Sequence, residues 1–220
     1  MGLVITILVL GLLASLSPTT IVVFILVLAT NRARANAAAF LVGWSVSLVV
    51  VFALSYGLGA ARQTQQGAGH TTLAAVEVLL GVALLATARR EWGRRRRPRS
   101  SSGVTRRFNE RLQRLNPWEA AVVGVLKEPW TLTAAAAVVV VRHHGALLVA
   151  LLALLVFTIA STATVGLAYL YFARQPGAAQ AHLDAIKDRM VESGPLITTI
   201  VSLVVGLYLI VGGVAGILHG

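Results

Sequence analysis

Long apolar runs constrain most strongly what this chain can fold into. Six of them lie at about 3–29, 36–60, 71–89, 117–141, 145–172 and 195–218. Each is long enough to cross a hydrocarbon core of about 30 Å as a helix. A hydrophobic content of 57% and a mean hydropathy of +0.80 leave too little polar surface for a soluble domain. Backbone groups in lipid must be paired within the protein, so the sequence predicts an all-α integral membrane protein with six spans.

The basic residues are distributed unevenly between the connections. Eleven of the 19 Lys and Arg residues fall between Arg89 and Arg114, after the third run. In total, sixteen basic residues follow the odd-numbered runs, whereas only Arg62 and Arg142 lie in the other connections. The positive-inside rule therefore predicts a cytoplasmic arginine-rich loop and both termini outside. The same rule explains the net charge of +11 without nucleic acid as a partner.

Two prolines interrupt the first and the fourth run near their middles. Pro18 and Pro129 each lack a backbone donor and clash with the carbonyl four residues earlier, which frees the carbonyls of Ala14 and Val125 at membrane depth. Matching breaks in two halves of a chain indicate the substrate site of a transporter.

The positions of the breaks also predict an internal repeat. Each half contains three spans, so a duplicated second half would enter the membrane in the opposite direction. We therefore expect a 3+3 inverted repeat, in which the first and fourth helices are broken at proline. The predicted divisions are a first repeat at 1–91, an arginine-rich cytoplasmic linker at 92–116 and a second repeat at 117–220.

Small polar residues surround the first break. Ser17 is a favoured N-cap and Pro18 a favoured first helical residue, while Thr19 and Thr20 add hydroxyl groups. The new half-helix would point its positive end at the membrane midplane, which favours anions. A simple proline kink is the alternative interpretation.

The second break carries charge. Lys127 and Glu128 lie inside the fourth span, where each charge costs about 2.5–3.5 kcal/mol. Lys127 could bind an anionic group or neutralise Glu128, whereas Glu128 could take up a proton in a proton-coupled carrier. A purely structural ion pair is the alternative. The predicted substrate site is Ser17, Pro18, Thr19, Thr20, Lys127, Glu128, Pro129, Trp130 and Thr131.

Three further features have both a functional and a structural interpretation. Glu77 is a possible gate or proton relay with Glu128, a partner of Lys127, or a carboxylate reaching the outer interface. Gly212 and Gly216 allow close helix packing, either within one subunit or in a homodimer. His143 has no acidic neighbours, so we expect no metal there.

Several kinds of chemistry have no support in the sequence. The chain has no cysteine, which excludes disulfides and thiol redox chemistry. It has no Walker A loop, serine nucleophile elbow or HExxH motif. We therefore expect neither enzymatic activity nor a cofactor.

Several of these motifs together resemble a known family. Ser17-Pro18, the run from Asn31 to Trp44 and Lys127-Glu128-Pro129 are similar to the GAP family, the glycopeptidolipid- and sulfolipid-addressing proteins of the LysE-type exporter superfamily. The resemblance implies a multi-pass protein of the bacterial inner (plasma) membrane that helps move envelope glycolipids outward. Exporters of amino acids in that superfamily usually carry an Asn-Pro-Lys type motif in the fourth span, so Lys-Glu-Pro argues against amino-acid export.

Three functions follow from these observations. The leading one is an exporter of anionic or glycosylated envelope lipids, with membrane lipids and a lipid-export machinery as partners. The first alternative is a LysE-type exporter of a small amino-acid-like or ionic solute. The second is a non-transporting scaffold of a lipid-export assembly.

Overall fold

The described part of the chain is helical. A computed structural model describes residues 2–63, 68–95, 114–143 and 147–218, and these contain eight helices and no strand. The helices are α1 (Gly2–Ser15), α2 (Pro18–Leu28), α3 (Ala33–Gln63), α4 (Ala68–Arg95), α6 (Pro117–Lys127), α7 (Trp130–Arg142), α8 (Leu147–Arg174) and α9 (Pro176–Leu218). The predicted all-α class is confirmed. Most of the predicted linker lies outside the described residues, but its first four residues continue α4.

Three of these helices are long and apolar enough to cross a membrane. They are the segments Ala33–Ala60, Leu147–Arg174 and Glu192–Leu218, with a mean hydropathy of 2.3 to 2.4. The pairs α1–α2 and α6–α7 also qualify if each is one bent span, which makes up to five candidates among the described residues. The predicted third span falls on α4, which is not among the candidates. Six spans therefore stay a prediction.

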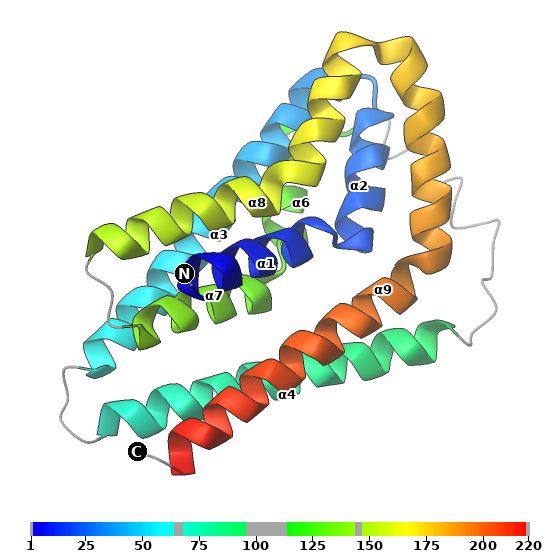
Figure 1. The fold of residues 1–220 in the computed structure, drawn as a ribbon. Coiled ribbons are helices and arrows are strands. Elements are labelled where there is room, and N and C mark those ends of the chain that lie inside the picture. The colour runs from blue at the N-terminus through cyan, green and yellow to red at the C-terminus, as the bar shows by residue number, and fades with distance from the viewer. Residues whose placement is uncertain (1, 64–67, 96–113, 144–146, 219–220) are drawn as a thin grey trace.

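The helices form two groups. The pair α4/α9 runs side by side, and the remaining helices form a main bundle in which α1 packs on α8 and α3 on α6 and α7 (Figure 1). The first part of α9 stands at an angle to the rest, and Pro195 lies inside this helix, where it cannot donate a backbone bond. Thr199 donates its hydroxyl to the Pro195 carbonyl at 2.6 Å.

Glycines permit the closest helix contacts. A Cβ atom at Gly43 in α3 would lie 2.1 Å from the Ala121 carbonyl oxygen in α6. In the α4/α9 pair, Gly81 and Gly206 face each other, and a Cβ on either would lie 2.7 or 3.0 Å from the other's carbonyl oxygen. Any side chain at these positions would force the helices apart.

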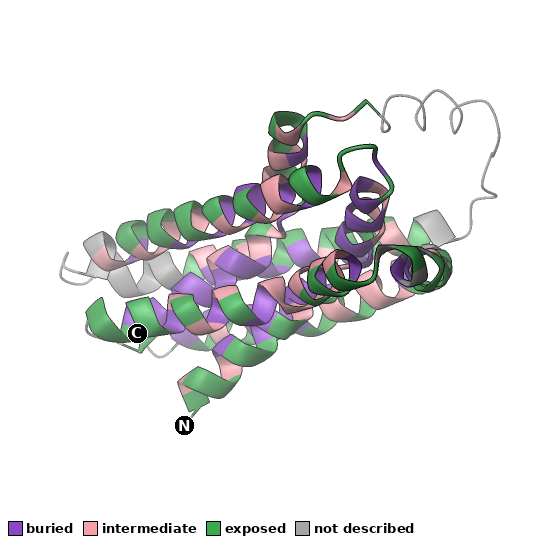
Figure 2. Cartoon of the chain, turned by 90° about the horizontal axis from the view of Figure 1, so that it is seen from above, coloured by how far each residue is buried: buried purple, intermediate pink, exposed green. Residues whose placement is uncertain are grey.

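Buried residues lie where the helices face each other, and exposed ones cover their outer sides (Figure 2). Many of the exposed residues are large and apolar, as expected of a surface in contact with lipid. An aromatic cluster of Phe24, Phe40 and Trp44 joins α2 to α3, with ring centroids 5.3 and 6.1 Å apart. This cluster lies in the same part of the bundle as the two helix breaks, because α2 begins at the first break and α3 packs on the helix that ends at the second.

Candidate functional site

The two helix breaks lie beside each other in the main bundle. The axes of α1 and α2 differ by 52° and those of α6 and α7 by 57°. Across the gap, the Thr20 hydroxyl donates to the Lys127 carbonyl oxygen at 3.0 Å and also lies 3.0 Å from Ser17 Oγ. Residues 107 positions apart in the chain are thus joined by one hydrogen bond. The structure brings together the two motifs that the sequence predicts as one site.

The first break is closed by local contacts. Pro18 is the first residue of α2, and the Ser17 carbonyl accepts the Ile21 amide at 3.1 Å, as an N-cap residue does. The Ser17 amide donates to the Ala14 carbonyl at 3.3 Å, so this freed acceptor is paired. Ser17 makes no side-chain cap, which leaves its hydroxyl to Thr20. Thr19 is exposed.

The second break is closed by side chains. The freed Val125 carbonyl accepts the Trp130 indole N–H at 3.1 Å and has a longer contact, 3.5 Å, with Ser47 Oγ in α3. The Glu128 carbonyl accepts the Trp130 amide at 3.0 Å. Trp130 therefore bridges the break, a role that the sequence did not indicate. The hydroxyl of Thr131 follows on α7, where the residue is half-buried.

Glu128 is the buried charge at this site. It is only 5% exposed, and its Oε1 accepts a short hydrogen bond from Thr133. Its Oε2 has no hydrogen-bond partner among the described residues. Lys127 is exposed, and no ion pair joins it to Glu128 in the described part of the chain. The arrangement in which Lys127 neutralises Glu128 is therefore not present in this structure.

A second buried polar atom belongs to the same helix contact. Trp44 in α3 is 1% exposed, and its indole Nε1 lacks a partner among the described residues. The Trp44 backbone nitrogen lies 3.0 Å from where a Cβ of Gly124 would stand, one helical turn before Glu128. A donor and an acceptor are thus left unpaired on helices that pack together. Unpaired buried groups are costly, and they mark positions that a ligand can satisfy.

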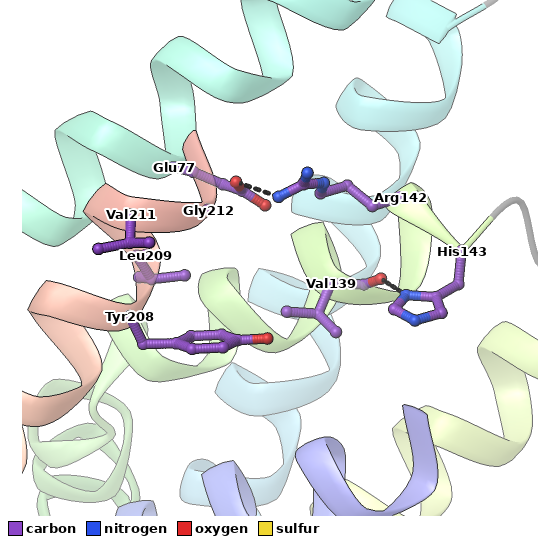
Figure 3. Close-up of a pocket in the computed structure, with 8 residues that line it drawn as sticks. All are labelled: Glu77, Val139, Arg142, His143, Tyr208, Leu209, Val211 and Gly212. Carbon is purple, nitrogen blue, oxygen red and sulfur yellow. Dashed lines mark hydrogen bonds and ion pairs between the residues drawn. The ribbon is translucent and has the colours of Figure 1, made fainter. Parts of the chain in front are cut away.

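Glu77 has a different environment from the one expected for a partner of Lys127. Its carboxylate is 2% exposed and accepts a bond from Arg142 Nη1 at 2.6 Å, joining α4 to the end of α7. Figure 3 shows this pair at a cavity of about 440 Å³ that His143, Tyr208 and Gly212 also line. From the sequence, Arg142 indicates only the topology. Its pairing was not visible from the sequence because 65 residues separate it from Glu77.

The glycines of α9 lie against this ion pair. A Cβ at Gly212 would lie 3.3 Å from Arg142 Nη1, and one at Gly216 would lie 3.7 Å from Nη2. The small-residue pattern is thus used within one chain, as the packing interpretation predicts. His143 places Nδ1 2.8 Å from the Val139 carbonyl oxygen. The described residues contain no group of three side chains able to hold a metal ion.

The comparisons with known proteins identify a family. Residues 7–215 match the family described as Sap, sulfolipid-1-addressing protein. This confirms the family predicted from the sequence, whereas its placement in the LysE-type superfamily stays a prediction. The chain has no match among curated proteins or solved structures.

Proposed function

We propose that this chain, which belongs to the sulfolipid-1-addressing protein family, is a secondary-type carrier, not an enzyme, that moves an anionic or glycosylated envelope lipid across or out of the inner membrane. The proposal rests on the hydrogen bond from the Thr20 hydroxyl to the Lys127 carbonyl, because this bond joins the two broken helices at their breaks. The family's name supports the class of substrate.

Reciprocal helix contacts support the proposed six-span inverted repeat. The broken helix α6 packs on α3, and its counterpart α1 packs on α8. Gly124 lies against the Phe40 carbonyl in the first contact, and Gly11 lies against the Phe157 carbonyl in the second, with Cβ positions 2.3 and 3.1 Å from the oxygens. The remaining counterparts, α4 and α9, pack on each other where Gly81 faces Gly206. Such exchange of equivalent contacts is expected of a pseudo-two-fold axis.

The charge distribution supports the proposed orientation. Arg34 near the start of α3 donates to the Ala173 carbonyl near the end of α8 at 3.3 Å, so these helix ends meet at one end of the bundle. Arg174 is the last residue of α8 at this end, and the arginine-rich loop follows α4. We assign this end to the cytoplasm by the positive-inside rule, with both termini outside.

The site offers groups suited to a charged or sugar-bearing head group. Ser17 and Thr19 provide hydroxyls at the positive end of α2, and Lys127 provides a cation. Glu128 and Trp44 contribute one unpaired acceptor and one unpaired donor. Glu128 has no cationic partner among the described residues, so it is our choice for the group that exchanges a proton during transport.

Acyl chains need an apolar path beside the polar site. A cavity of about 320 Å³ lies between α2, α8 and the first part of α9. It begins at Ile21, one residue after Thr20, and reaches Tyr171 and Ile186. We assign this cavity to the lipid tail, with the head group at the breaks.

Reconstitution tests the proposal. The purified protein is placed in vesicles with a trace of fluorescent sulfated glycolipid, and a membrane-impermeant quencher reports how fast the label changes leaflet. We expect protein-dependent exchange that is slower for the unsulfated analogue and is lost in Lys127→Ala and Glu128→Gln. Lys187→Ala is the matched control, because that cation pairs with Asp184 at 2.8 Å and does not line the apolar cavity.

Three outcomes would contradict this function. Exchange that is unchanged in both variants would place the site elsewhere. Movement of free sulfate without movement of the lipid would favour the small-solute exporter. The absence of protein-dependent exchange of either would favour the scaffold.

A further inference from the structure

The cavity around Arg142 has features of a second binding site (Figure 3). We propose that it binds the anionic head group of the substrate, a sulfate, phosphate or carboxylate, on the outer side of the membrane, and that Glu77 is the anion which the head group displaces. This inference rests on the proposed carrier function and adds an exit site to it.

The Arg142 side chain can serve two anions. It is 36% exposed, whereas its partner Glu77 is 2% exposed; both line the cavity, so the guanidinium is the more accessible of the two charges. A guanidinium group has five N–H donors arranged as a planar fork that matches sulfate, phosphate and carboxylate groups. The bond to Glu77 at 2.6 Å uses Nη1. An entering anion therefore meets an oriented cation that is already held in place.

The cavity has room for such a group. Its volume of about 440 Å³ lies within the range of about 300–1,000 Å³ that is usual for ligand sites. Gly212 keeps α9 from filling it, because a Cβ there would lie 3.3 Å from Arg142 Nη1 and 3.5 Å from Glu77 Oε2. The phenol group of Tyr208 points across the same space (Figure 3) and supplies a hydroxyl for a sugar or an ester oxygen.

The ion pair also connects the two groups of helices. Glu77 belongs to the α4/α9 pair and Arg142 to the main bundle, at the end opposite to Arg34. A head group that binds Arg142 weakens its attraction to Glu77, and this favours separation of the two groups at the outer end. Substrate binding can shift a conformational equilibrium only through such a difference in contacts. The site thus couples the arrival of the anion to opening.

Cysteine labelling of the full chain tests this site. The protein has no cysteine, so Val211→Cys introduces a single thiol on the cavity wall. In lipid nanodiscs, sodium sulfate at constant ionic strength should slow maleimide labelling of this thiol at least threefold, and saturably. Leu218→Cys, at the exposed end of α9, is the control and should label at an unchanged rate.

Variants of the ion pair identify the binding group. Glu77→Gln removes the competing anion, so protection should appear at a lower sulfate concentration. Arg142→Gln should abolish protection, and Glu77→Gln combined with Arg142→Gln should do so while removing both charges of the pair. Arg142→Lys keeps the charge without the fork and should give weaker protection. Protection that persists in the double variant would overturn the proposal.

A second arm separates this inference from the carrier function. A sulfated glycolipid incorporated in the nanodisc replaces free sulfate, with its unsulfated analogue as control. Protection by the lipid supports a head-group site, and protection by sulfate alone supports a site for free anions. Lipid exchange in vesicles without protection by either ligand would overturn the exit site and leave the carrier function intact. Protection without exchange would overturn the carrier function instead.

Discussion

Two buried carboxylates in this molecule differ in the charge of their partners. Glu77 is 2% exposed and pairs with the Arg142 guanidinium from another helix. Glu128 is 5% exposed, accepts from the neutral hydroxyl of Thr133 and keeps one oxygen without a partner in the described residues. A buried charge is tolerated when it is paired and bonded, and it is costly when it is not. Glu77 therefore suits a fixed ion pair that holds helices together. Glu128 suits a group that changes its protonation state.

The local backbone explains the difference. Glu128 precedes Pro129, and its φ of −63° and ψ of 133° are extended, so it ends α6 rather than continuing it. Its side chain consequently lies at the break, where the bond from Thr133 is its one side-chain hydrogen bond among the described residues. Glu77 lies within α4, where the glycines of α9 leave space for the long side chain of Arg142. The carboxylate at the break thus has no ion-pair partner among the described residues, whereas the carboxylate in α4 is held by Arg142.

Removal of the cation should have the largest effect. Arg142→Gln removes the guanidinium that pairs with the buried carboxylate of Glu77, and we expect a loss of about 3 kcal/mol in the free energy of unfolding. The double variant Glu77→Gln with Arg142→Gln should recover most of this loss, because neither charge remains. Chemical denaturation in detergent micelles measures both. Equal losses in the single and double variants would mean that the two residues are not coupled.

Glu128→Gln should affect transport more than stability. The amide can still accept from Thr133, so we expect the free energy of unfolding to change by about 1 kcal/mol or less. Lipid exchange should fall at least about tenfold, which corresponds to about 1.4 kcal/mol in the barrier, because the side chain can no longer exchange a proton. Glu119→Gln is the matched control, because Glu119 lies on α6 and its Oε2 accepts from the Asn116 backbone N–H at 2.9 Å. A tenfold fall in that control would remove the specific role of Glu128.

The contrast also shows which parts of the site the sequence could predict. Proline lacks a backbone N–H and clashes with the preceding turn of its own helix. Pro18 and Pro129 therefore predicted the breaks from local sequence alone. The positive end of α2 and the hydroxyls beside it followed from capping rules. The family was recognisable because its motifs are contiguous in the sequence.

Features that depend on packing were not predictable. The exposure of Lys127 depends on which face of α6 meets α3, and that contact is set by both helices and not by α6 alone. The pairing of Glu77 with Arg142 depends on how α4 and α7 are placed, which no local pattern records. The bond from the Trp130 indole N–H to the Val125 carbonyl was not predicted either, because it depends on how α7 is bent relative to α6.

The bond that joins the two breaks should have a moderate effect. Thr20→Val keeps the shape of the side chain but leaves the Lys127 carbonyl without its donor, and we expect a loss of about 1 kcal/mol. Thr19→Val is the matched control at the preceding residue. Thr19 is exposed, so this variant should change the free energy of unfolding by less than about 0.5 kcal/mol. Thermal unfolding of both variants measures the difference. Equal effects would show that the breaks are not held together through Thr20.

Gly212→Ala should have the smallest effect, and it tests the packing of α9 against the Glu77–Arg142 ion pair. Alanine favours a helix over glycine by about 1 kcal/mol, but its Cβ would lie 3.3 Å from Arg142 Nη1 and must displace the guanidinium slightly. We expect these terms to leave a net change within about 0.5 kcal/mol. Gly166→Ala in α8 is the matched control, because its Cβ would meet nothing within 4 Å, and it should gain close to the full helix preference. The difference in stability gain between the two variants measures how tightly α9 confines the Glu77–Arg142 ion pair. An equal gain would show that α9 does not confine it.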